Sequence, residues 1–153
     1  MYVSLNWLKD FVDLPTGVSP EELAKTLTVK TAETEGVSKG NELLDGVIAA
    51  LVEEVNPHPN ADKLRIAKIL IGTEHREIVC GGANLKEGMY VAYAPSGCKV
   101  RWHGEGDPVA LEKTKIRGVE SDGMICASEE IGLTKSASEG PEDILDLSST
   151  KPT

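Results

Sequence analysis

The hydrophobic positions in the first 44 residues repeat with helical spacing. The apolar side chains of residues 5–12 fall on one face of a short helix, which Ser4 can cap at its amino end. A second helix starts with Ser-Pro-Glu-Glu at residues 19–22, where the serine and the second glutamate form a capping box and proline takes the first helical position. Both helices are too short to enclose a core, so we expect this segment to pack against something else.

From residue 47 onward the pattern changes to short apolar runs rich in β-forming residues. Glycine and proline separate these runs, as they do between the strands of small antiparallel sheets. The predicted strands cover residues 47–55, 64–71, 77–80, 90–94, 114–116 and 124–127. This spacing favours a small antiparallel barrel, because closing the sheet removes edges that could template aggregation.

These patterns divide the chain into three parts. Residues 1–44 form a helical segment with a linker, and residues 45–133 form the barrel domain. Residues 134–153 form a C-terminal extension, which we expect to be the start of a further domain. A last short apolar run at residues 144–147 lies within that extension.

The composition is that of an ordinary globular protein, with 40% hydrophobic and 27% charged residues. No apolar run is long enough to cross a bilayer, and the N-terminus does not read as a secretion signal. The cysteines are three in number and widely spaced, so we expect reduced, buried thiols rather than disulfides or metal ligands. Together these features predict a cytoplasmic protein that has no contact with a membrane.

The charge balance bears directly on nucleic-acid binding. The net charge is −9, and residues 45–133 alone hold 14 acidic against 10 basic side chains. A domain that binds nucleic acid through its phosphates usually presents a positive face. We therefore predict that any binding of RNA by this chain on its own is weak.

Catalytic and metal-binding patterns are missing from the sequence. The three histidines are far apart, and none has a cysteine or histidine partner at the spacing of a metal site. The sequence has neither the G-x-x-x-x-G-K-[ST] frame of a P-loop nor the G-x-S-x-G frame of a nucleophile elbow. We predict that the chain itself supplies no catalytic residue and holds no metal or cofactor.

Four ordered motifs carry a family resemblance. They are HPNADKLRIAKI at residues 58–69, IVCGGANL at 78–85, YAPSGCKV at 93–100, and KTKIRGVESDGMICASEEIGL at 113–133. In this order and at these separations they resemble the tRNA-binding OB domain of aminoacyl-tRNA synthetases and free-standing tRNA-binding proteins. Members commonly read C-G-A-x-N where this chain has Cys-Gly-Gly-Ala-Asn at residues 80–84, so the shape of that loop is an open point.

The N-terminal segment decides among the hosts of this domain. MYVSLNWLKDFVDL at residues 1–14, SPEELAKTLT at 19–28 and AETEGV at 32–37 resemble the start of phenylalanyl-tRNA synthetase β subunits. The resemblance implies a mainly β fold with some α structure, in which a five-stranded OB-type barrel follows a small α-helical segment. It also implies a fragment, because β subunits of this family continue far beyond 153 residues.

The function implied by this resemblance is that of an accessory module. The parent ligase attaches phenylalanine to its tRNA during protein biosynthesis, using ATP and Mg²⁺ at a catalytic centre expected in the α subunit. Expected partners are that α subunit, the remainder of the β subunit in an assembly of two α and two β subunits, and tRNA. Two alternatives remain: a free-standing OB-fold tRNA-binding protein, and an architectural domain that only packs within the subunit.

Basic residues on the predicted strands are the candidates for RNA contact. Residues 99–103 and 113–117 place basic side chains two positions apart, hence on one face of a strand. The candidates are Lys63, Arg65, Lys99, Arg101, Trp102, Lys113, Lys115 and Arg117, with Lys68 as a further cation and Tyr90 or Tyr93 as further stacking groups. The alternative is that these cations form a solvated face and the aromatic rings lie in the core. Three family-motif residues, Asn84, Ser121 and Met124, are expected to shape turns and close the barrel.

Overall fold

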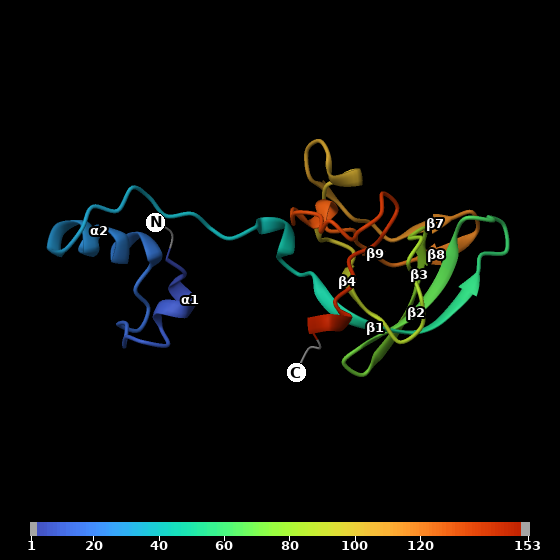
Figure 1. Ribbon diagram of the computed structural model, residues 1–153, viewed down its shortest axis with the longest axis horizontal. Coiled ribbons are helices and arrows are strands. Elements are labelled where there is room, and N and C mark those ends of the chain that lie inside the picture. Colours follow the sequence, from blue (N-terminus) through green and yellow to red (C-terminus); the bar gives the residue numbers. More distant parts are fainter. Residues whose placement is uncertain (1–2, 151–153) are drawn as a thin grey trace. The chain divides into compact units, whose positions relative to one another are not determined.

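A computed structural model describes residues 3–150 of the chain. The chain forms two compact units, one ending at Gly40 and the other beginning at Asn41 (Figure 1). The predicted boundary lay at residue 44, so the second unit starts four residues earlier than expected.

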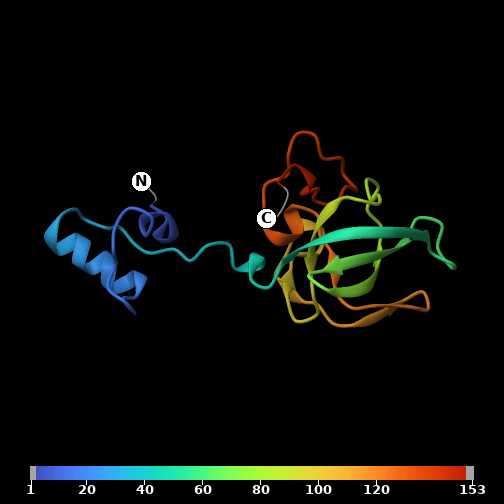
Figure 2. The same ribbon diagram turned by 90° about the horizontal axis from the view of Figure 1, so that it is seen from below.

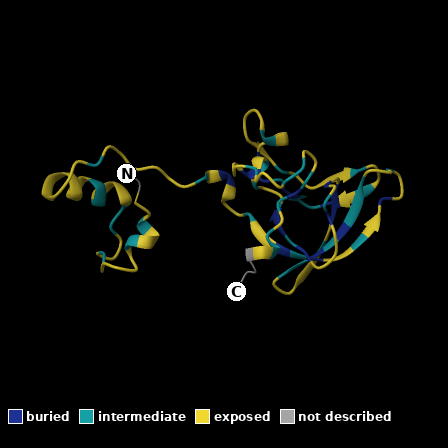
Figure 3. Cartoon of the chain, viewed as in Figure 1, coloured by how far each residue is buried: buried dark blue, intermediate teal, exposed yellow. Residues whose placement is uncertain are grey.

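The first unit contains the two predicted helices, α1 (Leu5–Leu8) and α2 (Pro20–Lys30). The capping box of α2 is present: the Ser19 hydroxyl accepts from the Glu22 amide, and the Glu22 carboxylate accepts from the Ser19 amide, both at 3.1 Å. None of residues 3–40 is buried (Figure 3). The rings of Trp7 and Phe11 meet edge to face at 5.0 Å but stay 59% and 69% exposed. This unit therefore has helices without a core of its own.

The second unit is a curled, five-stranded antiparallel sheet in the order β3-β2-β1-β4-β9 (Figure 1). Its strands are β1 (Ile48–Pro57), β2 (Arg65–Ile71), β3 (Glu74–Cys80), β4 (Tyr90–Ala94) and β9 (Met124–Ile125). Two small hairpins complete it, β5 (Lys99–Val100) with β6 (Val109–Ala110) and β7 (Thr114–Ile116) with β8 (Val119–Ser121). Four 3₁₀ turns lie at η1 (Glu42–Leu44), η2 (Trp102–Gly104), η3 (Glu129–Ile131) and η4 (Ser148–Thr150). The mainly β, OB-like architecture predicted from the sequence is confirmed.

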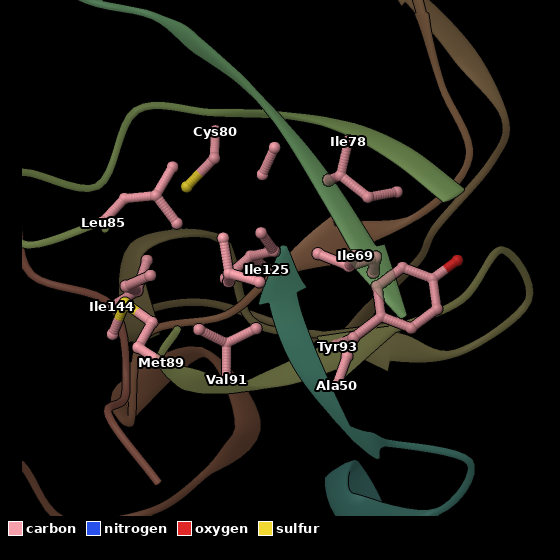
Figure 4. Packing of buried hydrophobic residues seen from close by; sticks show 12 residues of the cluster. Ala50, Ile69, Ile78, Cys80, Leu85, Met89, Val91, Tyr93, Ile125 and Ile144 are labelled. Carbon is pink, nitrogen blue, oxygen red and sulfur yellow. The ribbon is translucent and has the colours of Figure 1, made fainter. Parts of the chain in front are cut away.

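Strand β4 holds the unit together because both of its faces are buried. Val91 and Tyr93 point into the larger core, shown in Figure 4, where they meet residues of β1, β2, β3 and β9. Ala92 and Ala94 point to the other side and line a smaller core with Val100 and Cys126. The alternation of side chains along a strand explains this division. The small alanines allow residues 126–131 to approach the strand closely.

A serine hydroxyl helps to close the sheet where its backbone ladder ends. Strand β3 is an edge of the five-stranded sheet, and its Val79 amide donates to the Ser121 hydroxyl of β8 at 3.2 Å. The same hydroxyl lies 3.2 Å from the Gly123 carbonyl, to which it donates. Ser121 is 2% exposed, so this hydroxyl satisfies a buried amide that water cannot reach.

The chain after residue 133 does not leave the barrel. The Asn84 side chain forms two hydrogen bonds of 2.9 Å with the backbone of Ile144. Its NH2 group donates to the Ile144 carbonyl, and its oxygen accepts from the Ile144 backbone amide. The Ile144 side chain enters the larger core (Figure 4). A Cβ on Gly82 would come 2.6 Å from this side chain, which explains why glycine suits that position here. The barrel unit therefore extends past the predicted limit at residue 133.

We predict that replacing Ser121 with alanine lowers the free energy of unfolding by about 1–3 kcal/mol, the usual cost of leaving a buried amide without a partner. Chemical denaturation followed by circular dichroism measures the change. Ser138→Ala is the matched control, because that hydroxyl is exposed and its hydrogen bond is to the Ser136 hydroxyl, which is exposed too. Equal stabilities for the two variants would show that Ser121 does not close the barrel.

The buried thiols give a second prediction. All three cysteines are free, and burial raises the pKa of Cys126 to about 12. Because only the thiolate reacts quickly, Cys126 should resist a disulfide reagent at pH 8 in the native protein and react fully once the protein is denatured. Half-buried Cys98 should react first in the native state. Mass spectrometry of the labelled peptides distinguishes the sites, and uniform labelling of the native protein would contradict the expectation.

Candidate nucleic-acid interface

The predicted RNA-binding residues do not form one surface. Lys99, Arg101 and Trp102 lie on β5 and η2, whereas Lys113, Lys115 and Arg117 belong to the β7–β8 hairpin. The η2 turn and the hairpin lie apart in both views of the barrel unit (Figure 1, Figure 2). The alternating basic stretches therefore lie in two separate small sheets.

Arg65 is occupied by the protein itself. Its guanidinium donates to the carbonyl oxygens of Leu85 at 2.7 Å and Ala83 at 3.1 Å, and also to that of Gly82. These carbonyls belong to the loop after β3, which the arginine holds against the start of β2. In the structure Arg65 therefore fixes a turn, and its guanidinium is engaged by the backbone.

Two cations of the hairpin are also engaged. Lys113 forms an ion pair with Glu120 at 2.9 Å, and this hydrogen bond raises the pKa of the lysine. Arg117 adopts a positive φ of 49° and precedes Gly118 at φ 97°, as the two central residues of a tight hairpin turn require. Its guanidinium lies 3.4 Å from the Asn60 carbonyl, to which it donates.

The hairpin is docked on the loop between β1 and β2. Nδ1 of the buried His58 ring accepts a hydrogen bond of 3.1 Å from the Asn60 amide. Nε2 then donates to the Ile116 carbonyl at 3.0 Å. The Asn60 side chain donates to the Arg117 carbonyl at 3.0 Å. His58 is therefore a structural link between two loops.

Four candidate cations keep free side chains within the described residues. Lys63, Lys99, Arg101 and Lys115 are exposed and have no ion pair or side-chain hydrogen bond there. Only Lys99 and Arg101 converge, because both line a hollow of about 320 Å³ together with Asn41, Glu42 and Gly132.

Trp102 directly follows Arg101 in the chain. It is 57% exposed, and its ring meets that of His103 edge to face at 6.0 Å between centroids. Of the other two proposed stacking groups, Tyr90 is half-buried, and Tyr93 is buried with its hydroxyl donating to the Asp122 carbonyl. Tyr93 therefore cannot stack on a base, and Trp102 is the aromatic residue of the barrel unit best placed to do so.

A second hollow, of about 540 Å³, is acidic. Its carboxylates are already paired in part, Asp122 with Arg76 at 2.8 Å and Glu74 with the same arginine at 3.3 Å. Across residues 3–150 no group of three or more histidine, cysteine, aspartate or glutamate side chains could hold a metal ion.

The three family-motif residues lie at structural positions. Asn84 holds Ile144, Ser121 meets the edge of β3, and Met124 packs half-buried against the smaller core. Asn41 also has a structural role, which was not predicted from the sequence. Its side chain accepts from the Leu43 amide, which caps η1, and donates to the Ile131 carbonyl. The signal available in the sequence was an asparagine directly before Glu-Leu-Leu, since asparagine favours the cap position of a helical turn.

A curled antiparallel barrel with an exposed tryptophan beside free cations belongs to the class of small nucleic-acid-binding β domains. The family model described as "Putative tRNA binding domain" matches residues 47–150, and the chain belongs to this family. The match includes residues 134–150, in agreement with their place in the barrel unit.

Curated relatives cover most of this chain. A phenylalanine–tRNA ligase beta subunit from Geobacter metallireducens is 45% identical over 133 residues, which is 87% of this chain and 16% of the relative. The corresponding subunits from Protochlamydia amoebophila and Oceanobacillus iheyensis are 40% and 41% identical, over 88% and 87% of this chain. The chain thus spans about 16% of the length of these relatives. No helix among residues 3–150 has the length and apolar character needed to cross a membrane.

Arg65→Ala is predicted to lower the free energy of unfolding by about 2–3 kcal/mol, because three carbonyls lose a charged donor. Lys63→Ala removes a neighbouring positive charge that has no partner and should change stability by less than about 0.5 kcal/mol. Thermal unfolding of both variants tests the difference. Equal, small effects would mean that the guanidinium does not hold the loop.

Proposed function

We propose that this chain is an accessory tRNA-contacting module of a phenylalanine–tRNA ligase β subunit. The observation that carries the proposal is the combination of a tRNA-binding domain spanning residues 47–150 with relatives named as that subunit across nearly the whole chain. The OB-like barrel supports the same role, because such barrels bind nucleic acid through exposed rings and basic side chains.

The parent enzyme would join phenylalanine to its tRNA in the cytoplasm. In this proposal, ATP and Mg²⁺ act at a catalytic centre in the α subunit, within an assembly of two α and two β subunits. The residues of this chain would bind and orient tRNA but transfer no group. The free side chains of Lys99 and Arg101 support such a positioning role.

The affinity of the module alone should be low. Its net charge of −9 repels the phosphate backbone at long range, and ion pairs within the chain engage Arg76 and Lys113. Useful binding in the parent enzyme would therefore depend on other parts of the ligase to bring tRNA close to the barrel.

An architectural role is the second candidate, and the first unit supports it. Trp7 and Phe11 are largely exposed, and no residue of 3–40 is buried. Side chains of this kind gain free energy when another surface covers them. In this role the helices would pack against the remainder of the β subunit, as expected from the sequence.

Titration of the 153-residue chain with tRNA at 20 mM and 150 mM salt tests the tRNA role. We expect binding at micromolar protein at low salt and a steep loss of affinity at the higher concentration, because phosphate contacts release counterions. A protein of similar size and charge without this domain is the control. No binding at 20 mM salt would refute tRNA contact by the module alone and favour the architectural role.

A further inference from the structure

We propose that the hollow lined by Lys99 and Arg101, together with Trp102, binds one unpaired RNA nucleotide: the base stacks on the indole and the two cations hold its flanking phosphates. This inference rests on the proposed tRNA role and assigns it to one place. We call these three residues, with the hollow, the β5–η2 site.

The charges at the β5–η2 site suit a phosphate despite the acidic chain. Lys99 and Arg101 both line the hollow of about 320 Å³ and have side chains that are unpaired within residues 3–150, while Arg65, Lys113 and Arg117 are engaged by other groups of the barrel unit. A bound phosphate therefore breaks no existing ion pair. Glu42 also lines the hollow, and its negative charge repels an anion. Removing that charge should therefore strengthen the binding of a phosphate.

The backbone on either side of Trp102 is held by contacts with η3. The Arg101 amide donates to the Glu130 carbonyl at 2.8 Å, and the Gly104 amide donates to the Arg101 carbonyl at 3.0 Å. A Cβ on Gly104 would lie 2.5 Å from Glu129 Cβ, so this turn is pressed against η3. His103 takes a positive φ of 53°, which few residues adopt without support from their surroundings. The backbone of Trp102 is thus held in place while its indole is exposed, so stacking requires little ordering of the backbone.

The opposite wall of the hollow is also fixed. Asn41 bonds the Ile131 carbonyl and contacts Gly132, whose φ of 69° places it in the left-handed region. A Cβ at position 132 would lie 2.8 Å from two Asn41 side-chain atoms, so a larger residue would displace this wall. These backbone and amide contacts fix the part of the hollow formed by Asn41 and Gly132.

The chemistry favours an unpaired nucleotide over a duplex. One exposed indole can stack on a free base face, but the bases within a duplex already stack on one another. The two cations alone could attract any phosphate, so only the indole distinguishes single strands. An acidic peptide would also satisfy the cations, and it is tested as a competing ligand below.

The experiment uses the full chain with Trp7→Phe, which leaves Trp102 as the single tryptophan. Fluorescence is recorded while a single-stranded RNA 8-mer of mixed sequence, a 12-base-pair RNA duplex or a glutamate 10-mer is added. We expect the single strand alone to quench Trp102 strongly. The logarithm of its binding constant should fall with the logarithm of salt concentration with a slope of about −1.4, the value for two phosphate contacts.

Substitutions then assign the contacts, with binding measured by fluorescence anisotropy of a labelled 8-mer. Trp102→Ala should weaken binding roughly 5- to 150-fold, the range for loss of one base stack. Lys99→Ala and Arg101→Ala should each reduce the salt slope by about 0.7. Glu42→Gln should tighten binding, and Lys86→Ala, which removes an exposed lysine outside the hollow, should leave it within twofold.

The outcomes separate this proposal from the function on which it rests. If tRNA binds but Lys115→Ala weakens it more than Arg101→Ala does, the module contacts RNA elsewhere and the β5–η2 site is wrong. Equal quenching by duplex and single strand would refute base stacking. If the glutamate peptide quenches Trp102 and the RNA does not, the site is a protein-binding surface. Absence of any tRNA binding at low salt would overturn both proposals.

Discussion

A sheet of five strands in the order β3-β2-β1-β4-β9 leaves the backbone of its outer strands unsatisfied, and this constraint governs the barrel unit. A side chain meets part of that need: the Ser121 hydroxyl bonds the Val79 amide of β3 and fixes β8 beside it. The neighbouring Gly123 has φ 99°, and a Cβ there would lie 2.4 Å from the Ala94 carbonyl. A serine and a glycine two positions apart thus allow the chain to turn from β8 into β9 without opening the sheet.

The placement of the loops follows from this closure. Once β8 lies against β3, the β7–β8 hairpin reaches the loop after β1, where His58 and Asn60 bond to its backbone. The requirements of folding therefore use several of the polar and basic groups that could otherwise contact RNA. Among the groups left free, Arg101 and Trp102 lie at η2, which is anchored through a different set of contacts to η3.

Much of the fold could be read from the sequence, since alternating apolar positions and glycine turns are local signals. The range 90–94 matched β4, and the capping box at Ser19 formed as its spacing required. Strand β6 was not foreseen, because a two-residue strand leaves no periodic pattern. Residues 99–103 were expected on one strand, but only Lys99 and Val100 form β5, and η2 begins at Trp102.

The candidate interface was harder to predict, because a basic residue does not reveal its partner. Arg65 looks like a surface cation within an alternating strand, yet it binds three carbonyls of a loop 17–20 residues later. Lys99 and Arg101 look the same in the sequence and remain free. Tyr93 is buried because both faces of β4 are covered, whereas Trp102 is exposed on η2, and both outcomes are tertiary properties.

The hydrogen bonds between Asn84 and Ile144 have a consequence for folding during synthesis, because they join segments made at different times. Ribosomes release a chain from its N-terminus at about 5–20 residues per second, so β9 emerges roughly one to four seconds before Ile144. Until then the larger core has an open position beside Leu85 and Met89, and the Asn84 side chain has no partner in the 140–148 segment. The larger core of the nascent barrel is therefore incomplete until Ile144 has emerged. During that interval the exposed apolar surface is a binding site for a chaperone that shields such surfaces.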